Sequence, residues 1–336
     1  MFLRQALLLV AFSFIAIFAE SARAASCETQ AQMTPQQRDA LANQARSFIA
    51  LVQSGDTTSL RARLLPAIAS DFDAIASSVT TLRPLVQDAS ITVDNLYSLD
   101  ASTEQPGTQR TQFFCGSPIV VLTFNGIPPG RYAVAIVHAT GVPKPQQIAI
   151  ILAETPANQW QLAGFYSKPM IEADHDGLWY WTSARKYTQN HGNLAAWLYY
   201  SIADNLLSPV DFLASPNLDK LQQEWQQSRP PSLSANGAMM VNANGASFNV
   251  INLATTTDFG GLDLDLHYTP DSAQAMQLRT PVAARQQVTE LMTALLTQHP
   301  ELRQAFHGIW VHADQGQSNL FALELPMNQI GESLSR

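Results

Sequence analysis

The feature of this sequence that most restricts its fold is a row of short strand-like segments in the first half of the chain, punctuated by proline and glycine. These segments are rich in Val, Ile, Phe and Tyr, and they cover residues 91–99, 119–124, 132–139, 147–153 and 160–166. The links between the later segments contain only a few residues, whereas a parallel crossover needs a dozen or more. The pattern therefore predicts an antiparallel sheet that follows the chain as a meander.

Helical patterns come before these strands. Residues 34–37 (Thr-Pro-Gln-Gln) have the composition of a capped helix start, with proline at the first helical position. Apolar residues then recur with helical spacing as far as Gly55, which ends the helix. A short helix after Gly55 and a third helix over residues 71–82 are also expected. Helices on one face of an antiparallel sheet make an α+β domain, which we place at residues 30–170.

This order of elements resembles the NTF2-like or cystatin-like domains. The resemblance depends on Phe48 in the first helix, on Gly55-Asp56 directly after it, and on a curved meander that ends in residues 160–166 (Trp-Gln-Leu-Ala-Gly-Phe-Tyr). It implies a fold of helices on a curved sheet. It implies no activity, because such domains serve as enzymes, ligand pockets and interaction modules alike.

A second resemblance covers the middle of the same region. Residues 124–134, with Pro129-Gly130 and Tyr132, are similar to the Pro-Gly-x-Tyr hairpin of transthyretin-like or carboxypeptidase-regulatory β-sandwiches. The preceding helices do not fit a sandwich, so we prefer the first resemblance.

Helical spacing returns in the second half of the chain. Apolar residues recur in this way over residues 178–187 and 194–206. This pair, residues 177–210, resembles a single tetratricopeptide-type helical hairpin, with Tyr187 and Ala196 at aromatic and small positions of that motif. A single copy implies a helical hairpin and not a peptide-binding array, because such units need about three neighbours to bury a shared core.

The remaining residues repeat the mixture of strands and helices. Strand-like segments at residues 239–241, 247–253 and 262–268, a helix opened by Thr280-Pro281, and a closing hairpin across residues 314–316 predict another small unit. The predicted fold class is α+β: helices packed on an antiparallel sheet, then a helical hairpin, then a second small α+β unit. The expected boundaries are 1–24 for a signal peptide, 30–170, 176–228 and 232–330.

The first residues have the features of a secretory signal peptide. Arg4 supplies the charge, and residues 6–19 form an uncharged, mostly apolar stretch. Ala22 and Ala24 supply the small residues before a cleavage point. As a helix the apolar stretch would span about 21 Å, which is short of the about 30 Å of a bilayer core. We expect cleavage, no membrane span afterwards and an exported protein, periplasmic or secreted; the chain as a whole looks like an exported bacterial protein.

The sequence holds 2 cysteines, Cys27 and Cys115. In an exported chain an even pair favours a disulfide, which would tie the mature N-terminus to the first domain. Two alternatives remain open. In the first, the two cysteines are unrelated free thiols. In the second, Cys27 carries a lipid, although the preceding Ala24-Ala25-Ser26 is a poor match to a lipidation signal.

Charge and motifs exclude several classes of function. The chain has 19 Lys and Arg against 27 Asp and Glu, and a nucleic-acid partner needs a basic surface. The usual dinucleotide, phosphate-loop, His-Glu-x-x-His and Cys-x-x-Cys motifs do not occur in the sequence. We therefore assign no catalytic residue and expect no cofactor and no nucleic-acid partner.

A candidate metal site lies in the segment Asp263-Leu264-Asp265-Leu266-His267. Alternation along a strand places Asp263, Asp265 and His267 on one face and the leucines on the other. Two carboxylates and an imidazole on one face are able to hold a divalent cation. The alternative, which we prefer, is a half-buried strand with a wet polar face. His138 and His312 each lie in an apolar strand pattern and are expected to be core or edge histidines.

Residues 172–177 (Glu-Ala-Asp-His-Asp-Gly) offer a second, denser group of oxygen donors. They could bind calcium, although they lack the spacing of an EF-hand. The preferred interpretation is a polar linker in which Asp174 or Asp176 caps the following helix.

Aromatic residues on the two central helices are the candidate binding residues. If some face outward, they form a surface that stacks on a sugar or peptide, or a contact for a partner protein. These are Trp179, Trp181, Trp197 and Tyr200. We therefore predict a non-catalytic binding or assembly module of the cell envelope whose partner is a protein, peptide or glycan. The alternative is an enzyme with a pocket inside the first curved sheet, lined by Asp94, Tyr97 or His138.

Overall fold

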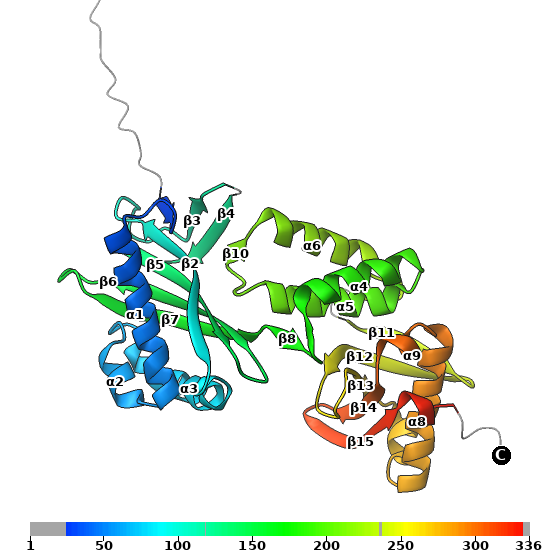
Figure 1. Ribbon diagram of the computed structural model, residues 1–336. Helices are drawn as coiled ribbons and strands as arrows, with labels where there is room; N and C mark the ends of the chain where they lie inside the picture. The colour runs from blue at the N-terminus through cyan, green and yellow to red at the C-terminus, as the bar shows by residue number, and fades with distance from the viewer. Residues whose placement is uncertain (1–24, 118, 235–236, 332–336) are drawn as a thin grey trace, which may run out of the picture.

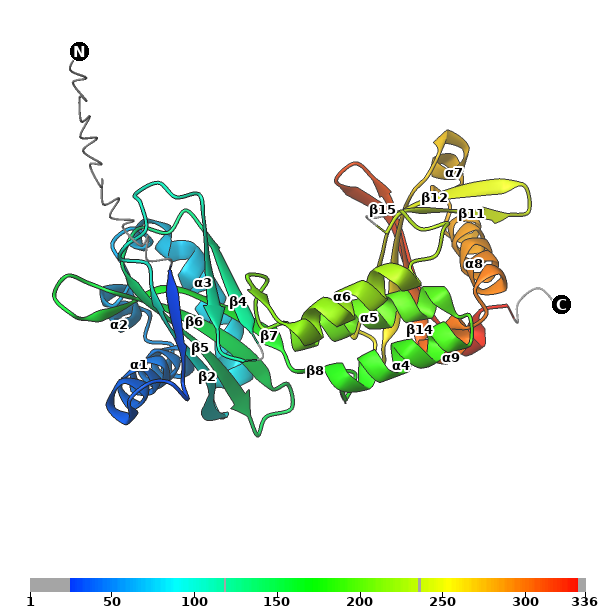
Figure 2. The same ribbon diagram turned by 90° about the horizontal axis from the view of Figure 1, so that it is seen from above.

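The computed structural model describes residues 25–117, 119–234 and 237–331, and the expected signal peptide at residues 1–24 lies outside these ranges. Two units, each a sheet with helices, lie at opposite ends of the molecule, and a group of helices lies between them (Figures 1 and 2). Helices and mostly antiparallel strands confirm the α+β class. Among the described residues, no helix combines the length and the apolar character that crossing a membrane requires.

The N-terminal unit is built on a five-stranded antiparallel sheet in the order β1-β2-β5-β6-β7. Its strands are β1 (Ser26–Thr29), β2 (Ser90–Asp100), β5 (Arg131–Thr140), β6 (Gln146–Glu154) and β7 (Trp160–Pro169). One face is covered by the helices α1 (Pro35–Ser54), α2 (Thr57–Ala62) and α3 (Phe72–Val86), with a short 3-10 turn, η1 (Ala69–Asp71), before α3. Helix α1 begins with the predicted capping box of Thr34 and Gln37 and ends at Gly55, whose φ of 73° is left-handed.

The prediction of one simple meander is wrong for residues 119–124. They form β4 (Val120–Asn125), which pairs with β3 (Arg110–Cys115) and with β10 (Leu213–Ala214) in a separate small sheet. The reason lies in β5, where residues 133–137 are all buried, so both faces of the main sheet need an apolar cover. Phe113 and Leu122 supply it on the face opposite α1.

The middle of the chain forms α4 (Gly177–Gln189), α5 (Asn193–Leu207) and α6 (Pro216–Ser228). A short hairpin leads from the first sheet into α4. Its antiparallel strands, β8 (Ile171–Glu172) and β9 (His175–Asp176), have two residues each. Asp176 caps α4, because its Oδ1 accepts a hydrogen bond of 2.8 Å from the backbone N–H of Trp179. This is the linker role that the sequence predicted for Asp174 or Asp176.

The C-terminal unit is a five-stranded sheet in the order β11-β12-β13-β14-β15. Its strands are β11 (Met239–Ala243), β12 (Ala246–Thr256), β13 (Asp263–Thr269), β14 (Gly308–Gln315) and β15 (Ser318–Pro326), and η2 (Met327–Gln329) follows. Between β13 and β14 the chain crosses over through α7 (Ser272–Gln277), α8 (Pro281–Gln298) and α9 (Leu302–Ala305), so these two strands are parallel. The predicted closing hairpin is confirmed by β14 and β15.

One apolar core joins the middle helices to the C-terminal sheet. It contains Tyr180 of α4, Leu198 of α5, Val288 of α8 and Leu266 of β13, all of them buried. Because Leu264, Leu266 and Tyr268 point into this core, the alternate residues of β13 point to the other face of the sheet. The polar side chains predicted on that face therefore lie outside the core.

Candidate functional site

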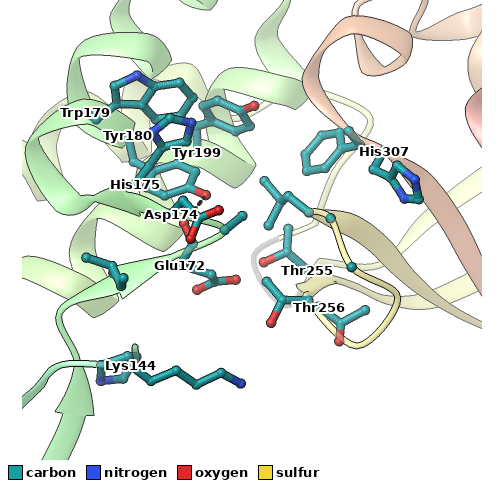
Figure 3. A pocket seen from close by; sticks show the side chains of 18 of the residues that line it. Lys144, Glu172, Asp174, His175, Trp179, Tyr180, Tyr199, Thr255, Thr256 and His307 are labelled. Atoms are coloured by element: carbon teal, nitrogen blue, oxygen red, sulfur yellow. Dashed lines mark hydrogen bonds between the residues drawn. The ribbon is translucent and has the colours of Figure 1, made fainter. Parts of the chain in front are cut away.

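A cleft of about 920 Å³ lies where the two units approach each other. Lys144 borders it from the turn between β5 and β6, and the β8–β9 hairpin contributes Glu172. The opposite wall carries Thr255 and Thr256 at the end of β12, with His307 just before β14 (Figure 3). Clefts between units are common ligand sites, because side chains from distant segments converge there.

The turn of the β8–β9 hairpin has an unusual backbone. Its two central residues, Ala173 and Asp174, have φ angles of 44° and 64°, the left-handed region that favours glycine. An alanine there costs about 1 kcal/mol or more. The hairpin is held in place by the Tyr180 hydroxyl, which donates a hydrogen bond of 2.9 Å to the Glu172 carbonyl. This conformation presents Glu172, Asp174 and His175 to the cleft (Figure 3).

A group of stacked aromatic rings forms the upper wall of the cleft in Figure 3. The His175 ring lies parallel to the Trp179 indole, with centroids 3.6 Å apart, and Tyr180 contacts the indole edge-on at 5.0 Å. The Tyr199 ring contacts the Tyr180 ring edge-on, and its hydroxyl donates a hydrogen bond of 2.6 Å to the Ala305 carbonyl. Tyr180 is fully buried, whereas Trp179 is 39% exposed, so part of the indole is accessible although His175 covers one of its faces.

The charges around the cleft are mixed. Burial raises the pKa of Glu172, and a hydrogen bond with the Thr255 side chain only partly opposes this. Burial, with the nearby carboxylates of Glu172 and Asp174, also raises the pKa of Tyr180, so its hydroxyl stays protonated. Lys144, on the same wall as Glu172, adds a positive charge, so no single sign of charge dominates the lining. Such a surface suits a neutral polar ligand better than a highly charged one.

Only Trp179 of the four predicted binding aromatics borders this cleft. The indole N–H of Trp181 donates a hydrogen bond of 2.7 Å to Glu224 of α6, and the guanidinium of Arg185 lies over the same ring. Tyr200 is buried, and Trp197 contacts Trp225. These three side chains pack the central helices against each other.

The predicted metal residues do share one face of β13, but they fall into two groups. Asp265 and His267 lie with His312 of β14, because the parallel register places His267 beside His312. Asp263 lies with two residues that the sequence analysis did not select, His307 and Glu324. The two groups depend on pairing between strands that are far apart in sequence. The patterns of apolar strands around His312 gave no sign of it.

Only Asp263 is buried in the group around it, because His307 is exposed and Glu324 is intermediate. Asp263 is fully buried, and its Oδ1 lies 3.0 Å from Nδ1 of His307. Burial raises the pKa of Glu324, and the Asp263 charge raises it further against the opposing effect of His307. The direction of this shift favours the protonated form of Glu324, which lessens the repulsion between the two carboxyl groups. Oδ2 of Asp263 and Oε1 of Glu324 are nevertheless shielded and have no hydrogen bond among the described residues.

Gly308 leaves the space that this buried carboxylate occupies. A β-carbon at residue 308 would lie 2.6 Å from Oδ1 of Asp263 and 2.8 Å from the carbonyl oxygen of Leu325. We expect Gly308→Ala to lower the free energy of unfolding by about 1–3 kcal/mol, the usual cost of overpacking. The control is Gly130→Ala, where the nearest atom, in the Tyr132 ring, is 3.8 Å from the added carbon. Equal urea midpoints for the two variants would contradict this prediction.

The polar residues that were expected to line an enzyme pocket also lie close together. Asp94, Tyr97 and His138 line a smaller pocket of about 320 Å³, which Leu178 and Trp181 of α4 close from the other side. Burial raises the pKa of Tyr97, and the Asp94 charge raises it further. The phenol therefore stays protonated, which disfavours a phenolate nucleophile in this pocket.

Comparison with protein-family models, curated proteins and solved structures gave no match. The resemblances to NTF2-like domains and to a tetratricopeptide hairpin stay predictions. The site is therefore interpreted from its own geometry.

Proposed function

We propose that this protein is an exported, non-catalytic binding module whose cleft takes a segment of a neutral glycan. The observation behind this proposal is the accessible Trp179 indole at the cleft, backed by His175 and Tyr180. Indole faces stack on the C–H faces of sugar rings, and surrounding carboxylates, hydroxyls and amides exchange hydrogen bonds with sugar hydroxyls. Glu172 and Thr255 supply such groups beside the aromatic wall.

Export is part of the proposal. The disulfide between Cys27 and Cys115 supports it, because disulfides persist in oxidising compartments. The signal-like composition of residues 1–24 supports it as well. The compartment would be the periplasm or the extracellular space.

We favour binding over catalysis because both imidazoles at the cleft already contact other side chains of the protein. The His175 ring is stacked on Trp179, and Nδ1 of His307 lies 3.0 Å from the buried Asp263. General-base catalysis requires an imidazole within hydrogen-bond reach of the group that it deprotonates. Among the described residues, neither histidine has a recorded hydrogen bond to a serine, threonine or cysteine.

The test is binding of soluble oligosaccharides to the purified chain. We expect chitooligosaccharides or maltooligosaccharides, which are neutral, to bind and to change tryptophan fluorescence. Trp179→Ala should weaken binding at least tenfold, because a central tryptophan contributes about 2 kcal/mol or more to a binding site. The measurement is isothermal titration calorimetry, with circular dichroism to show that the variant is folded.

Phe259→Ala is the matched control. Phe259 has the same exposure as Trp179, 39%, but is not among the residues that line the cleft. Its removal should leave affinity unchanged. An equal loss for both variants, or binding of basic or acidic peptides in place of every glycan tested, would overturn the proposal.

A further inference from the structure

We propose that the open face of the C-terminal sheet holds one divalent transition-metal ion, with zinc as the best fit, bound by Asp265, His267 and His312. The site is independent of the glycan cleft. It differs from the arrangement that the sequence suggested, because Asp263 belongs to the neighbouring group with His307 and Glu324, and His312 takes its place.

The distances between the three ligand atoms fit a single ion. Oδ1 of Asp265 lies 3.3 Å from Nε2 of His267 and 3.3 Å from Nε2 of His312. A tetrahedral zinc ion with bonds of about 2.0–2.1 Å separates its ligands by about 3.3–3.4 Å. All three ligand atoms lie within 4.8 Å of one another. The two imidazole rings are stacked with centroids 4.3 Å apart, so binding of one ion in the plane of both rings requires one ring to rotate.

A second carboxylate orients one of the imidazoles. Nδ1 of His267 lies 2.6 Å from Oδ2 of Asp314, and Asn319 donates a hydrogen bond of 3.0 Å to the other oxygen of Asp314. When Nδ1 of His267 donates its proton to Asp314, the lone pair of the ring is on Nε2, which lies 3.3 Å from Oδ1 of Asp265. This carboxylate–histidine arrangement accompanies most histidines that bind zinc, because it fixes the tautomer and the ring orientation.

The ligand atoms lack other partners. Within the part of the chain that the structure describes, Oδ1 of Asp265 and Nε2 of His312 are shielded from solvent and have no hydrogen bond. These two atoms are 3.3 Å apart, but they do not form a hydrogen bond with each other. Shielded polar atoms without partners are rare and costly in proteins, and a shared ion would satisfy both.

The three side chains lie partly at the surface, although two of their ligand atoms are shielded. The side chains of His267, Asp265 and His312 are 28%, 22% and 13% exposed, whereas Asp263 of the second group is fully buried. Two imidazoles and one carboxylate suit zinc and related ions, whereas magnesium and calcium prefer oxygen ligands alone. Three protein ligands leave a further position for water.

The experiment measures metal binding by the full chain, without a histidine tag and after treatment with a chelator. We expect one Zn²⁺ or Co²⁺ per chain by calorimetry, a visible absorption band typical of tetrahedral Co²⁺, and a melting temperature that rises with zinc concentration. Calcium should give no such rise. His267→Gln and His312→Gln should each lower zinc affinity at least a hundredfold. Asp314→Asn should keep the stoichiometry and lower the affinity about ten- to a hundredfold.

His307→Gln is the control, because it removes the exposed histidine of the neighbouring group. It should leave zinc affinity unchanged. Circular dichroism and thermal melting without metal would show that each variant is folded. No zinc uptake by the folded native chain would overturn the proposal, as would uptake that survives in the His267→Gln/His312→Gln double variant or an equal loss in His307→Gln.

Discussion

Replacement of Cys27 and Cys115 by alanine should lower the free energy of unfolding of the N-terminal unit by about 4 kcal/mol. The disulfide joins β1 to β3 across a sequence separation of 88. Without it, the unfolded chain regains the entropy of a long open loop, which is the main source of this stabilisation. In calorimetry the transition of this unit should fall by about 10 °C.

The rest of the molecule provides an internal control for this experiment. Both cysteines lie in the N-terminal unit, and the core of the middle helices and the C-terminal sheet contains neither of them. If the units melt separately, only one transition should shift. Alkylation of the native exported protein should label neither cysteine. Free thiols at both positions, or a double variant with the melting profile of the native chain, would contradict the prediction.

The disulfide also shows what kind of information the sequence contained. An even pair of cysteines after a signal-like segment predicted the bond without knowledge of the fold. The capping box at Thr34 and Gln37 was equally accessible, because caps depend on residues only three positions apart. The small sheet of β3, β4 and β10 was not, since it pairs residues 121–122 with residues 213–214. Nothing local in either segment specifies its partner.

The candidate sites show the same difference between local sequence signals and long-range pairing. Alternation placed Asp265 and His267 on one face of β13, which the structure confirms. The third residue of that group, His312, depends on the parallel pairing of β13 with β14 across the α7–α9 crossover. The cleft brings together Lys144, Glu172 and Thr255 from three distant segments. The one local signal was the dense polar run at residues 172–177, which the sequence analysis interpreted as a linker.

A carboxylate shared by the three central helices gives the second large expected effect. Glu224 of α6 accepts hydrogen bonds of 2.7 Å and 2.8 Å from the guanidinium of Arg185 and one of 2.7 Å from the indole of Trp181. The Tyr200 hydroxyl of α5 lies 3.4 Å away. The side chain of Glu224 is 22% exposed and that of Arg185 is 40% exposed. Removal of this group leaves several donors unpaired between α4, α5 and α6.

We expect Glu224→Ala to lower the free energy of unfolding by about 2 kcal/mol. This exceeds the value for an exposed ion pair because Trp181 also loses its acceptor, and it is below the value for a buried pair because Arg185 is 40% exposed. The measurement is urea unfolding followed by circular dichroism. Gln223→Ala is the control, since Gln223 is the preceding residue of the same helix and is exposed. Equal midpoints for the two variants would contradict the role assigned to Glu224.

The isosteric variant Glu224→Gln separates the charge from the packing. Burial raises the pKa of Glu224, but the hydrogen bonds from Arg185 and Trp181 and the Arg185 charge outweigh this, so the pKa lies below its ordinary value of 4.5. A group whose pKa is depressed by folding stabilises the protein above its unfolded pKa, and this stabilisation is lost as the pH falls through the folded pKa. The native chain should therefore exceed Glu224→Gln in stability most clearly near neutral pH. Below about pH 5 the difference should shrink, because the native carboxylate then takes up a proton on unfolding. Equal stability of the native chain and Glu224→Gln at every pH would show that the group acts through its shape and not through its charge.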